Sequence, residues 1–396
     1  MITTTYEELF NYKTIYNAHL RGRRCKRDKK PLVRFEMTML DRLTELHNKV
    51  LDGSYQPGKY STFTVKIPKV REIQTQPYDN RVVQHVLCDN VLTPYFGARA
   101  IIDNAACQKN KGMHFALDRF EKMLQTYIRK HGVTGYFLKC DILKYFPSIP
   151  HKRLKEIICS HIVDEKIKKL VADIIDGYHT RPAFLDKYGI PYRHNGEKTG
   201  RGIPIGNQTS QIFGMFYLNK VDRLIKERLR IKVYSRYMDD FVLLHEDKEY
   251  VKYALQEITK AVEYLGLQFN SKTQILPIKN GITYLGFRFI ITPTGKVIRM
   301  VKKVTKKRLR WRADLVKKAY LDGIVPIERV EASLAAFHGH LKGGNCYRFE
   351  SELKQKLTFT EKEQQEHQLN IEKQQKIKEG KNGEWTKCNW CIKCRD

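Results

Sequence analysis

The chain has 396 residues, and its 73 Lys and Arg against 43 Asp and Glu give a formal net charge of +30 at pH 7. This excess is larger than solubility requires and indicates a polyanionic partner, for which nucleic acid is the favoured class; a basic surface without a partner is the alternative. No run of about 18 uncharged apolar residues occurs, which argues against a membrane span. With 41% hydrophobic residues, the length predicts two or three subdomains with real cores.

The N-terminal third is predicted to be helical, with one β-hairpin. A basic cluster at residues 21–30 precedes residues 35–53, whose apolar spacing and terminal glycine predict a capped amphipathic helix. Residues 62–77 alternate apolar and polar side chains, as strands of a hairpin do. Helical spacing then returns at residues 80–96 and 114–130.

The central part alternates strands and helices. Residues 135–150, GYFLKCDILKYFPSIP, predict a buried strand that carries Asp141 and is ended by Pro147. The next segments predict a helical region, a Gly- and Pro-rich loop, a long amphipathic helix and two short strands that meet near Asp239 and Asp240: residues 151–180, 181–207, 210–229 and 231–247.

The C-terminal part begins with a helix at 251–270 and a hairpin at 282–300 that turns at Pro293–Gly295. Residues 301–323 carry nine Lys or Arg and one Trp, which is typical of a solvated basic helix or of one that follows a nucleic-acid backbone. From about residue 351 the chain is polar, which predicts an exposed helix or a disordered tail.

Three aspartates, Asp141, Asp239 and Asp240, lie within apolar, strand-like segments. Burying a carboxylate without a partner is costly, and neighbouring carboxylates repel each other. If the strands are neighbours, a divalent cation would offset this repulsion, and carboxylate oxygens suit Mg²⁺ or Mn²⁺ better than Zn²⁺. Two such ions support nucleotidyl transfer, which fits the cationic surface. A purely structural polar network is the alternative that the residue pattern leaves open.

Several segments, in this order, resemble the motifs of reverse transcriptases over about residues 60–345. They are KVREIQTQPYDNRVVQHVL, LKCDILKYFPSI, IPIGNQTSQIFGMFYLN, YMDD and YLGF. The resemblance implies an α+β right-hand polymerase with fingers, a palm of antiparallel sheet and helices, and a helical thumb. It implies the following parts: 1–134, basic segment and fingers; 135–152, first part of the palm; 153–204, fingers or palm insertion; 205–290, second part of the palm with YMDD; 291–350, thumb; and 351–396, polar tail with a cysteine cluster.

The same resemblance implies roles for individual residues. Asp141, Asp239, Asp240 and the carbonyl of Ile142 would hold two Mg²⁺ ions, with Mn²⁺ as the alternative. Lys272 would be the general acid for the leaving pyrophosphate. Without the resemblance, a surface lysine would be the plain interpretation of Lys272. The residues implied to contact the nucleotide, its triphosphate or its sugar are Lys69, Arg71, Phe146, Ile205, Gly206 and Gln211.

Of the nucleotide contacts, Lys69 and Arg71 would grip the triphosphate, and Phe146 would be the steric gate that favours dNTPs. Solvated hairpin charges and a core phenylalanine are the alternatives for these three. Residues Tyr284, Leu285, Gly286 and Phe287 correspond to the primer grip. The residues implied to follow the duplex backbone on the basic helix are Lys306, Lys307, Arg308, Arg310 and Trp311.

One motif departs from the usual reverse-transcriptase pattern. Most members have Gln before the glycine and end in SP, whereas this chain has Ile205 and Gln211 in IGNQTSQ. This form resembles the enzymes of diversity-generating retroelements, which copy a template RNA with errors at adenine so that the cDNA diversifies a target gene. Ile205 cannot form side-chain hydrogen bonds, so we expect weaker discrimination between correct and incorrect pairs. The alternative is that Ile205 only packs and fidelity is set elsewhere.

The resemblance implies template RNA, an RNA/cDNA duplex, dNTPs and a small basic accessory protein, as a monomer or an oligomer, as partners. The alternatives are an antiviral-defence or retron-type reverse transcriptase and, in another class, an inactive RNA-binding scaffold. With no signal-like N-terminus and six scattered cysteines, we expect a cytoplasmic protein, bacterial or phage-encoded, with no membrane partner. Cys388, Cys391 and Cys394 form C-x2-C-x2-C, and we favour simple thiols there over a Zn²⁺ site.

Overall fold

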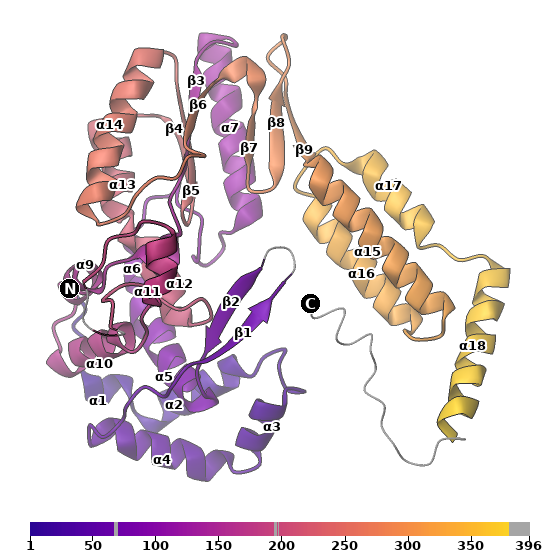
Figure 1. Ribbon diagram of the computed structural model, residues 1–396, viewed down its shortest axis with the longest axis horizontal. Helices are drawn as coiled ribbons and strands as arrows, with labels where there is room; N and C mark the ends of the chain where they lie inside the picture. The colour runs from indigo at the N-terminus through magenta and orange to yellow at the C-terminus, as the bar shows by residue number, and fades with distance from the viewer. Residues whose placement is uncertain (67–69, 194–195, 197, 380–396) are drawn as a thin grey trace. The chain divides into compact units, whose positions relative to one another are not determined.

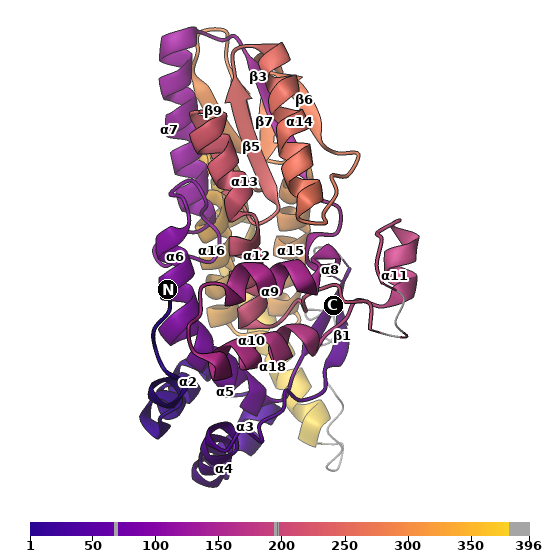
Figure 2. The same ribbon diagram turned by 90° about the vertical axis from the view of Figure 1, so that its left-hand side faces the viewer.

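The computed structural model describes residues 1–66, 70–193, 196 and 198–379 (Figures 1 and 2). The described residues form two compact units, one within residues 1–116 and 138–275, and a second of residues 117–137 and 276–379. Both units combine helices with strands, and the two hairpins of the first unit and the meander of the second are antiparallel. The predicted α+β class is therefore confirmed.

The first 100 residues form a helical layer with one hairpin. The predicted helix at 35–53 is divided between two helices. The first ends at Glu36 and the second begins at Met39, because Thr38 leaves the helical backbone conformation. The predicted hairpin is confirmed as strands β1 (Ser61–Val65) and β2 (Arg71–Thr75). The helices are α1 (Tyr6–Leu9), α2 (Tyr12–Gly22), α3 (Lys30–Glu36), α4 (Met39–Leu51), α5 (Tyr78–Leu87), the π-helical turn η1 (Cys88–Leu92) and α6 (Thr93–Arg99).

A four-stranded sheet carries the aspartates. Its strands follow the order β4 (Val233–Tyr237), β5 (Asp240–His245), β3 (Tyr136–Asp141) and β6 (Gln274–Pro277). Helices α13 (Asn219–Arg223) and α14 (Lys248–Tyr264) lie on one side of β4 and β5 (Figures 1 and 2). Tyr237 pairs with Asp240, so Met238 and Asp239 alone form the turn between β4 and β5. Met238 adopts a φ of 58°, in the left-handed region that a non-glycine residue rarely occupies.

The remaining helices of the first unit follow the predicted regions with two differences. The long helix predicted at 210–229 is divided, because the chain changes direction at Leu218 and then widens into a π-helical turn. A short helix occupies part of the loop predicted at 181–207. These elements are α8 (Tyr145–Ser148), α9 (His151–Cys159), α10 (Glu165–Asp176), α11 (Pro182–Lys187), α12 (Gln208–Tyr217) and η2 (Leu224–Arg228).

The second unit contains a three-stranded meander of β7 (Ile282–Tyr284), β8 (Phe287–Ile291) and β9 (Val297–Val301). The predicted turn at Pro293–Gly295 is confirmed between β8 and β9. A tighter turn that the sequence analysis did not assign joins β7 to β8 at Leu285 and Gly286, whose φ angles are 46° and 85°. Helix α7 (Met113–His131) packs on the meander through Phe120, whose ring centroid lies 5.4 Å from that of Tyr284.

Four helices complete the second unit: α15 (Lys303–Leu321), α16 (Ile327–Leu341), α17 (Tyr347–Lys356) and α18 (Glu361–Glu379). Helix α15 contacts the other three. The polar segment after residue 351 includes α18, one face of which is held on α15: the His367 ring stacks on Tyr320 at 3.9 Å, and Asn370 Nδ2 donates to the Leu321 carbonyl at 2.9 Å. Among the helices of the described residues, none combines the length and apolar composition needed to cross a bilayer.

A buried ion pair lies beneath the turn at Met238–Asp239. Arg236 is fully buried and binds Asp222 of α13 through two bonds, Nε to Oδ1 at 2.7 Å and Nη2 to Oδ2 at 2.5 Å. Its remaining donors reach the carbonyls of Met238 and Met215, both at 2.9 Å. Burial alone would lower the pKa of Arg236, but the attraction of Asp222 outweighs it and raises the pKa, so the guanidinium stays charged.

Breaking this pair should destabilise the fold strongly. Replacing Arg236 by Met leaves the buried Asp222 carboxylate without its ion-pair partner, although the Tyr234 hydroxyl still donates to it at 2.6 Å, so we expect a loss of about 3–5 kcal/mol in the free energy of unfolding. The double variant Arg236→Met/Asp222→Leu should recover most of this loss. Denaturant unfolding measures both. The control is Lys260→Met, whose exposed pair with Glu257 should contribute less than about 1 kcal/mol. A double variant as unstable as the single one would contradict the ion-pair account.

Candidate active site

The three aspartates come from two strand ends and one turn. Asp141 ends β3, Asp240 begins β5, and Asp239 lies in the turn before it. Strands β3 and β5 are neighbours in the sheet, which brings the carboxylates to one region, as the sequence analysis required for a joint site. All three side chains are half-buried. The pKa of Asp239 is raised, first by burial and then by the charge of Asp141, while Arg71 and Arg236 act in the opposite direction.

A turn at residues 270–273 holds Asp141 from three directions. Asn270 Nδ2 donates to the Asp141 carboxylate, and Asn270 N donates to its backbone carbonyl at 3.0 Å. The Asp141 backbone N donates to Thr273 Oγ1 at 3.2 Å. Lys139 lies on β3 two residues before Asp141, and its Nζ is 3.7 Å from Asp240 Oδ1 of the neighbouring strand β5. The sequence analysis missed Asn270, Thr273 and Lys139; only the proximity of Lys139 to Asp141 in the chain could have suggested one of them.

The donor chemistry of these residues fits a hard divalent cation. Carboxylate and carbonyl oxygens are what Mg²⁺ prefers, and Ile142, whose carbonyl was predicted to contribute, directly follows Asp141 on the same strand edge. The raised pKa of Asp239 shows that a further negative charge is disfavoured here, which a cation would relieve. In the described part of the chain, no three His, Cys, Asp or Glu side chains gather closely enough to hold an ion. The fit thus rests on the donor type and on the electrostatics.

Phe146, the predicted steric gate, lies on α8 against a glycine of α12. A Cβ placed on Gly214 would lie 2.4 Å from Phe146 Cε1, far inside van der Waals contact. The neighbouring Tyr145 hydroxyl donates to the Gly214 carbonyl at 2.6 Å. Gly214 therefore contacts both aromatic residues: its carbonyl accepts from Tyr145, and the absence of a side chain leaves room for the Phe146 ring. The sequence analysis did not assign Gly214, since a glycine inside a helical pattern gives no sign of what packs on it.

The predicted cations of the nucleotide site differ in how far the structure places them. Arg71 is exposed at the start of β2 and is close enough to lower the pKa of Asp239. Lys272 is exposed on the turn that holds Asp141, and its backbone N donates to Asn270 Oδ1 at 2.7 Å. Lys69 lies outside the described residues. Arg71 thus lies within electrostatic range of Asp239, and Lys272 lies on the turn that bonds Asp141.

The IGNQTSQ segment is bound to the β1–β2 hairpin through its backbone. Gln74 N of β2 donates to the Ile205 carbonyl at 3.1 Å. Gly206 has a φ of 144°, and a Cβ there would lie 2.2 Å from the Gln74 carbonyl oxygen, so the close approach requires glycine. The Ile205 side chain is half-buried, and Gln211 is exposed, with Oε1 3.7 Å from Cys107 Sγ.

The second unit carries the other predicted contacts. Of the four residues predicted to form the primer grip, Tyr284 and Phe287 are fully buried, and the turn residues Leu285 and Gly286 are partly exposed to solvent. On α15, Lys306 and Arg310 face α17: Arg310 pairs with Glu352 at 2.5 Å, and both cations lie over Phe349. Lys307 and Trp311, one helical turn apart, are exposed, and Arg308 is half-buried. Cys388, Cys391 and Cys394 lie outside the described residues.

Comparison with known proteins identifies the family of the segment that carries these residues. The model of the family described as "Reverse transcriptase (RNA-dependent DNA polymerase)" matches residues 67–289, more than half of the chain, and includes all three aspartates. The putative COX1/OXI3 intron 2 protein of Saccharomyces cerevisiae is 24% identical over 252 residues, which are 48% of this chain and 28% of that protein.

Two solved structures of apo telomerase from Candida tropicalis are also similar, at 14% and 15% identity, with TM-scores of 0.45 and 0.41. The matches cover 67% and 62% of this chain and 52% and 55% of those chains, the second of which is truncated from its C-terminal domain. The chain thus spans about a quarter of the length of the yeast relative and about half of each telomerase chain. By the family match over residues 67–289, the chain belongs to the reverse transcriptase (RNA-dependent DNA polymerase) family.

Proposed function

We propose that this chain is an RNA-directed DNA polymerase whose reaction takes place at Asp141, Asp239 and Asp240. The observation that carries the proposal is the meeting of these carboxylates at neighbouring strand ends, with Arg71 in electrostatic reach, inside the segment that matches the family. An inactive RNA-binding scaffold would have no need of a half-buried carboxylate held at a raised pKa. Groups with shifted pKa values concentrate at functional sites.

In this proposal the primer 3′-oxygen bonds to the α-phosphorus of a dNTP, and the bond from that phosphorus to the pyrophosphate oxygen breaks. Bound Mg²⁺ would supply charge neutralisation of the phosphates at the aspartates. Arg71, with Lys69, binds the triphosphate, and Lys272 donates a proton to the leaving pyrophosphate. Phe146 lies against the sugar and crowds a 2′-hydroxyl. The turn at residues 270–273 keeps Asp141 in place while these groups change charge.

We further propose that the enzyme makes adenine-mutagenised cDNA for diversification of a target gene. Ile205 supports this, because its side chain offers no hydrogen bond to a nucleotide or template while its backbone remains fixed by β2. The template RNA and a small basic accessory protein would be its partners. A defence or retron-type role is the second candidate, and the error spectrum separates the two. The division into fingers, palm and thumb, with a thumb at 291–350, belongs to the same proposal.

Replacing Asp239 by Asn should abolish polymerisation and stabilise the metal-free chain. Loss of one catalytic carboxylate should lower primer extension at least about 100-fold, which is several kcal/mol of barrier. The raised pKa means that ionised Asp239 opposes folding at neutral pH, so the variant should unfold at a higher temperature in chelator. That advantage should shrink as pH falls through the folded pKa and vanish below the unfolded Asp pKa of about 3.9.

Mg²⁺ at ten times its Kd should stabilise the wild type by about 1.4 kcal/mol and the variant by less. Glu263→Gln, which removes an exposed carboxylate on α14, is the matched control and should change neither activity nor stability. Equal primer extension by the wild type and Asp239→Asn would remove the catalytic assignment.

Adding one methyl group at Gly214 should act on the nucleotide site through Phe146. The ring must move from the new Cβ, so Gly214→Ala should lower kcat/KM for dNTPs by about tenfold or more and alter the rNTP-to-dNTP preference. In a Phe146→Ala background the same change should cost less than about twofold, because contacting residues are non-additive. Steady-state kinetics with both nucleotide classes tests this. Gly97→Ala, at a helical glycine with open space around it, is the control. Equal effects in both backgrounds would refute the coupling.

Restoring the common glutamine should raise fidelity. Ile205→Gln changes only a half-buried side chain and keeps the backbone bond to Gln74, so the chain should stay folded and active. Misincorporation opposite template adenine should fall by about tenfold for each 1.4 kcal/mol of added discrimination. Sequencing of cDNA from a defined RNA measures it. Ile205→Leu, which adds no hydrogen-bonding group, should leave the spectrum unchanged. An unchanged spectrum in Ile205→Gln at equal activity would assign fidelity to other residues.

A further inference from the structure

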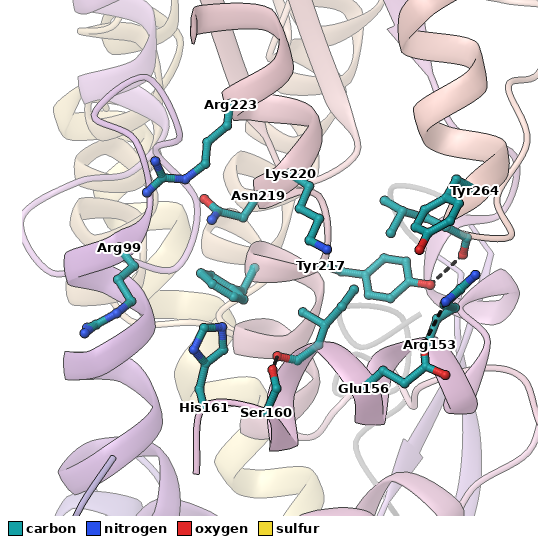
Figure 3. A pocket seen from close by; sticks show the side chains of 13 residues that line it. Arg99, Arg153, Glu156, Ser160, His161, Tyr217, Asn219, Lys220, Arg223 and Tyr264 are labelled. Atoms are coloured by element: carbon teal, nitrogen blue, oxygen red, sulfur yellow. Dashed lines mark hydrogen bonds and ion pairs between the residues drawn. The ribbon is translucent and has the colours of Figure 1, made fainter. Parts of the chain in front are cut away.

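Two adjoining hollows open in the surface of the first unit, one on each side of helix α9. The first, of about 480 Å³, lies among α6, α9, α12, α13 and the end of α14 (Figure 3). The second, of about 710 Å³, lies between α9 and residues 191–193 and 199–201. Arg153 and Glu156 of α9 line both hollows, so the two adjoin at these residues. No described residue that lines them belongs to the candidate active site.

Cations dominate this surface. We call it the α9 track and define it by Arg99, Lys152, Arg153, Arg193, Lys220 and Arg223. The carboxylates that line the two hollows are Glu156, which pairs with Arg153 at 2.8 Å, and Asp176, which pairs with Lys155 at 2.6 Å. Outside the lining, Glu227 pairs with Arg223 at 2.8 Å. His161 adds no charge near neutral pH, because burial and then the charge of Arg99 lower its pKa.

Flat apolar surfaces accompany the cations. Tyr264 is 62% exposed, and the Arg153 guanidinium lies 4.4 Å from its ring centroid. Phe216 and Tyr217 line the first hollow as well, with the Tyr217 hydroxyl donating to the Leu265 carbonyl at 2.5 Å (Figure 3). Of these three rings only that of Tyr264 is exposed, since Phe216 and Tyr217 are buried. A cationic surface with an exposed ring suits single-stranded nucleic acid, because phosphates contact the cations and a base stacks on the ring.

One buried polar group also lacks its partner. Asn219, in the wall of the first hollow, is 8% exposed, and its Oδ1 accepts no hydrogen bond from any described residue. A buried acceptor without a donor destabilises the fold until a ligand supplies the donor. Ribose hydroxyls and base amino groups are donors of the kind that this amide lacks, whereas a bare inorganic anion offers none. The observation favours a nucleotide over a simple anion.

We propose that the α9 track binds a single-stranded RNA segment outside the catalytic cleft, as a second point of attachment for the RNA that is copied. The choice of RNA rests on the proposed function, which requires a template RNA; the phosphate and base chemistry is independent of it. Each hollow falls within the size range of about 300–1,000 Å³ in which pockets take nucleotide-sized ligands. The track would hold a part of the template RNA that is not being copied while another part passes through the active site.

The test uses three probes and the full chain. The first probe is a short RNA template–primer hairpin, and the other two are the same hairpin with a 15-nucleotide unstructured extension of RNA or of DNA. The track variant is Lys152→Gln/Lys220→Gln/Arg223→Gln. The control variant, Lys13→Gln/Lys49→Gln/Lys252→Gln, removes equal charge from exposed lysines of α2, α4 and α14 in the same unit. Fluorescence anisotropy gives Kd over a series of salt concentrations, and primer extension on the short hairpin reports the active site.

The wild type and the control should bind the RNA-extended probe at least tenfold more tightly than the short one. The track variant should keep less than a twofold preference, with its salt slope smaller in magnitude by about 2, since each lost phosphate contact removes about 0.7. All three should extend the short hairpin at equal rates.

A track variant that keeps the tenfold preference would overturn the proposal. An equal gain in affinity from the DNA extension would also overturn it, because the track would then bind single strands in general. No gain in affinity from either extension would overturn it too and would leave an acidic protein surface as the ligand class. Failure of the proposed function appears separately. In that case the wild type would not extend the hairpin, while the binding data would still decide the fate of the track.

Discussion

The buried pair of Arg236 and Asp222 is the interaction on which the candidate site depends. One guanidinium joins α13 through Asp222, α12 through the Met215 carbonyl and the YMDD turn through the Met238 carbonyl. The turn needs such support, because Met238 adopts a left-handed φ that costs a non-glycine residue about 1–3 kcal/mol. A charge that is fully desolvated can remain only where every donor is satisfied. The geometry of Asp239 and Asp240 therefore depends on a residue that never reaches the substrate.

The site joins rigid parts to exposed ones. Asp141 and Asp240 lie at the ends of sheet strands, and Asp239 lies in the turn between β4 and β5. Arg236 bonds that turn through the Met238 carbonyl, and the turn at 270–273 bonds Asp141. The charged partners, Arg71 and Lys272, are exposed on a hairpin and a turn. This distribution suits a polymerase. The cations that bind the triphosphate must release pyrophosphate in every cycle, whereas the carboxylates must keep their positions.

Much of the architecture could be predicted from the sequence, and the reasons are local. Alternation at 62–77, apolar runs around Asp141 and YMDD, and helical spacing at 114–130 and 251–270 each correspond to elements of the structure. Contacts between distant segments could not be predicted. Nothing in the sequence near Asp141 indicates that Asn270 and Thr273 hold it, and the glycine of FGMFY does not indicate that an aromatic ring 68 residues earlier needs its space. The break at Met37–Thr38 and the turn at Leu285–Gly286 depend on packing in the same way.

The close contact of Gly206 with β2 has a consequence for how such an enzyme can evolve. The backbone at this point is committed to the hairpin, and position 206 cannot change without opening that junction. At the neighbouring Ile205 the bond to β2 is made by the backbone carbonyl, which every side chain leaves in place. Under the proposed function, copying accuracy and structural integrity would then depend on adjacent but different positions. Selection could make the enzyme more or less faithful through one codon, without compensating changes elsewhere in the chain.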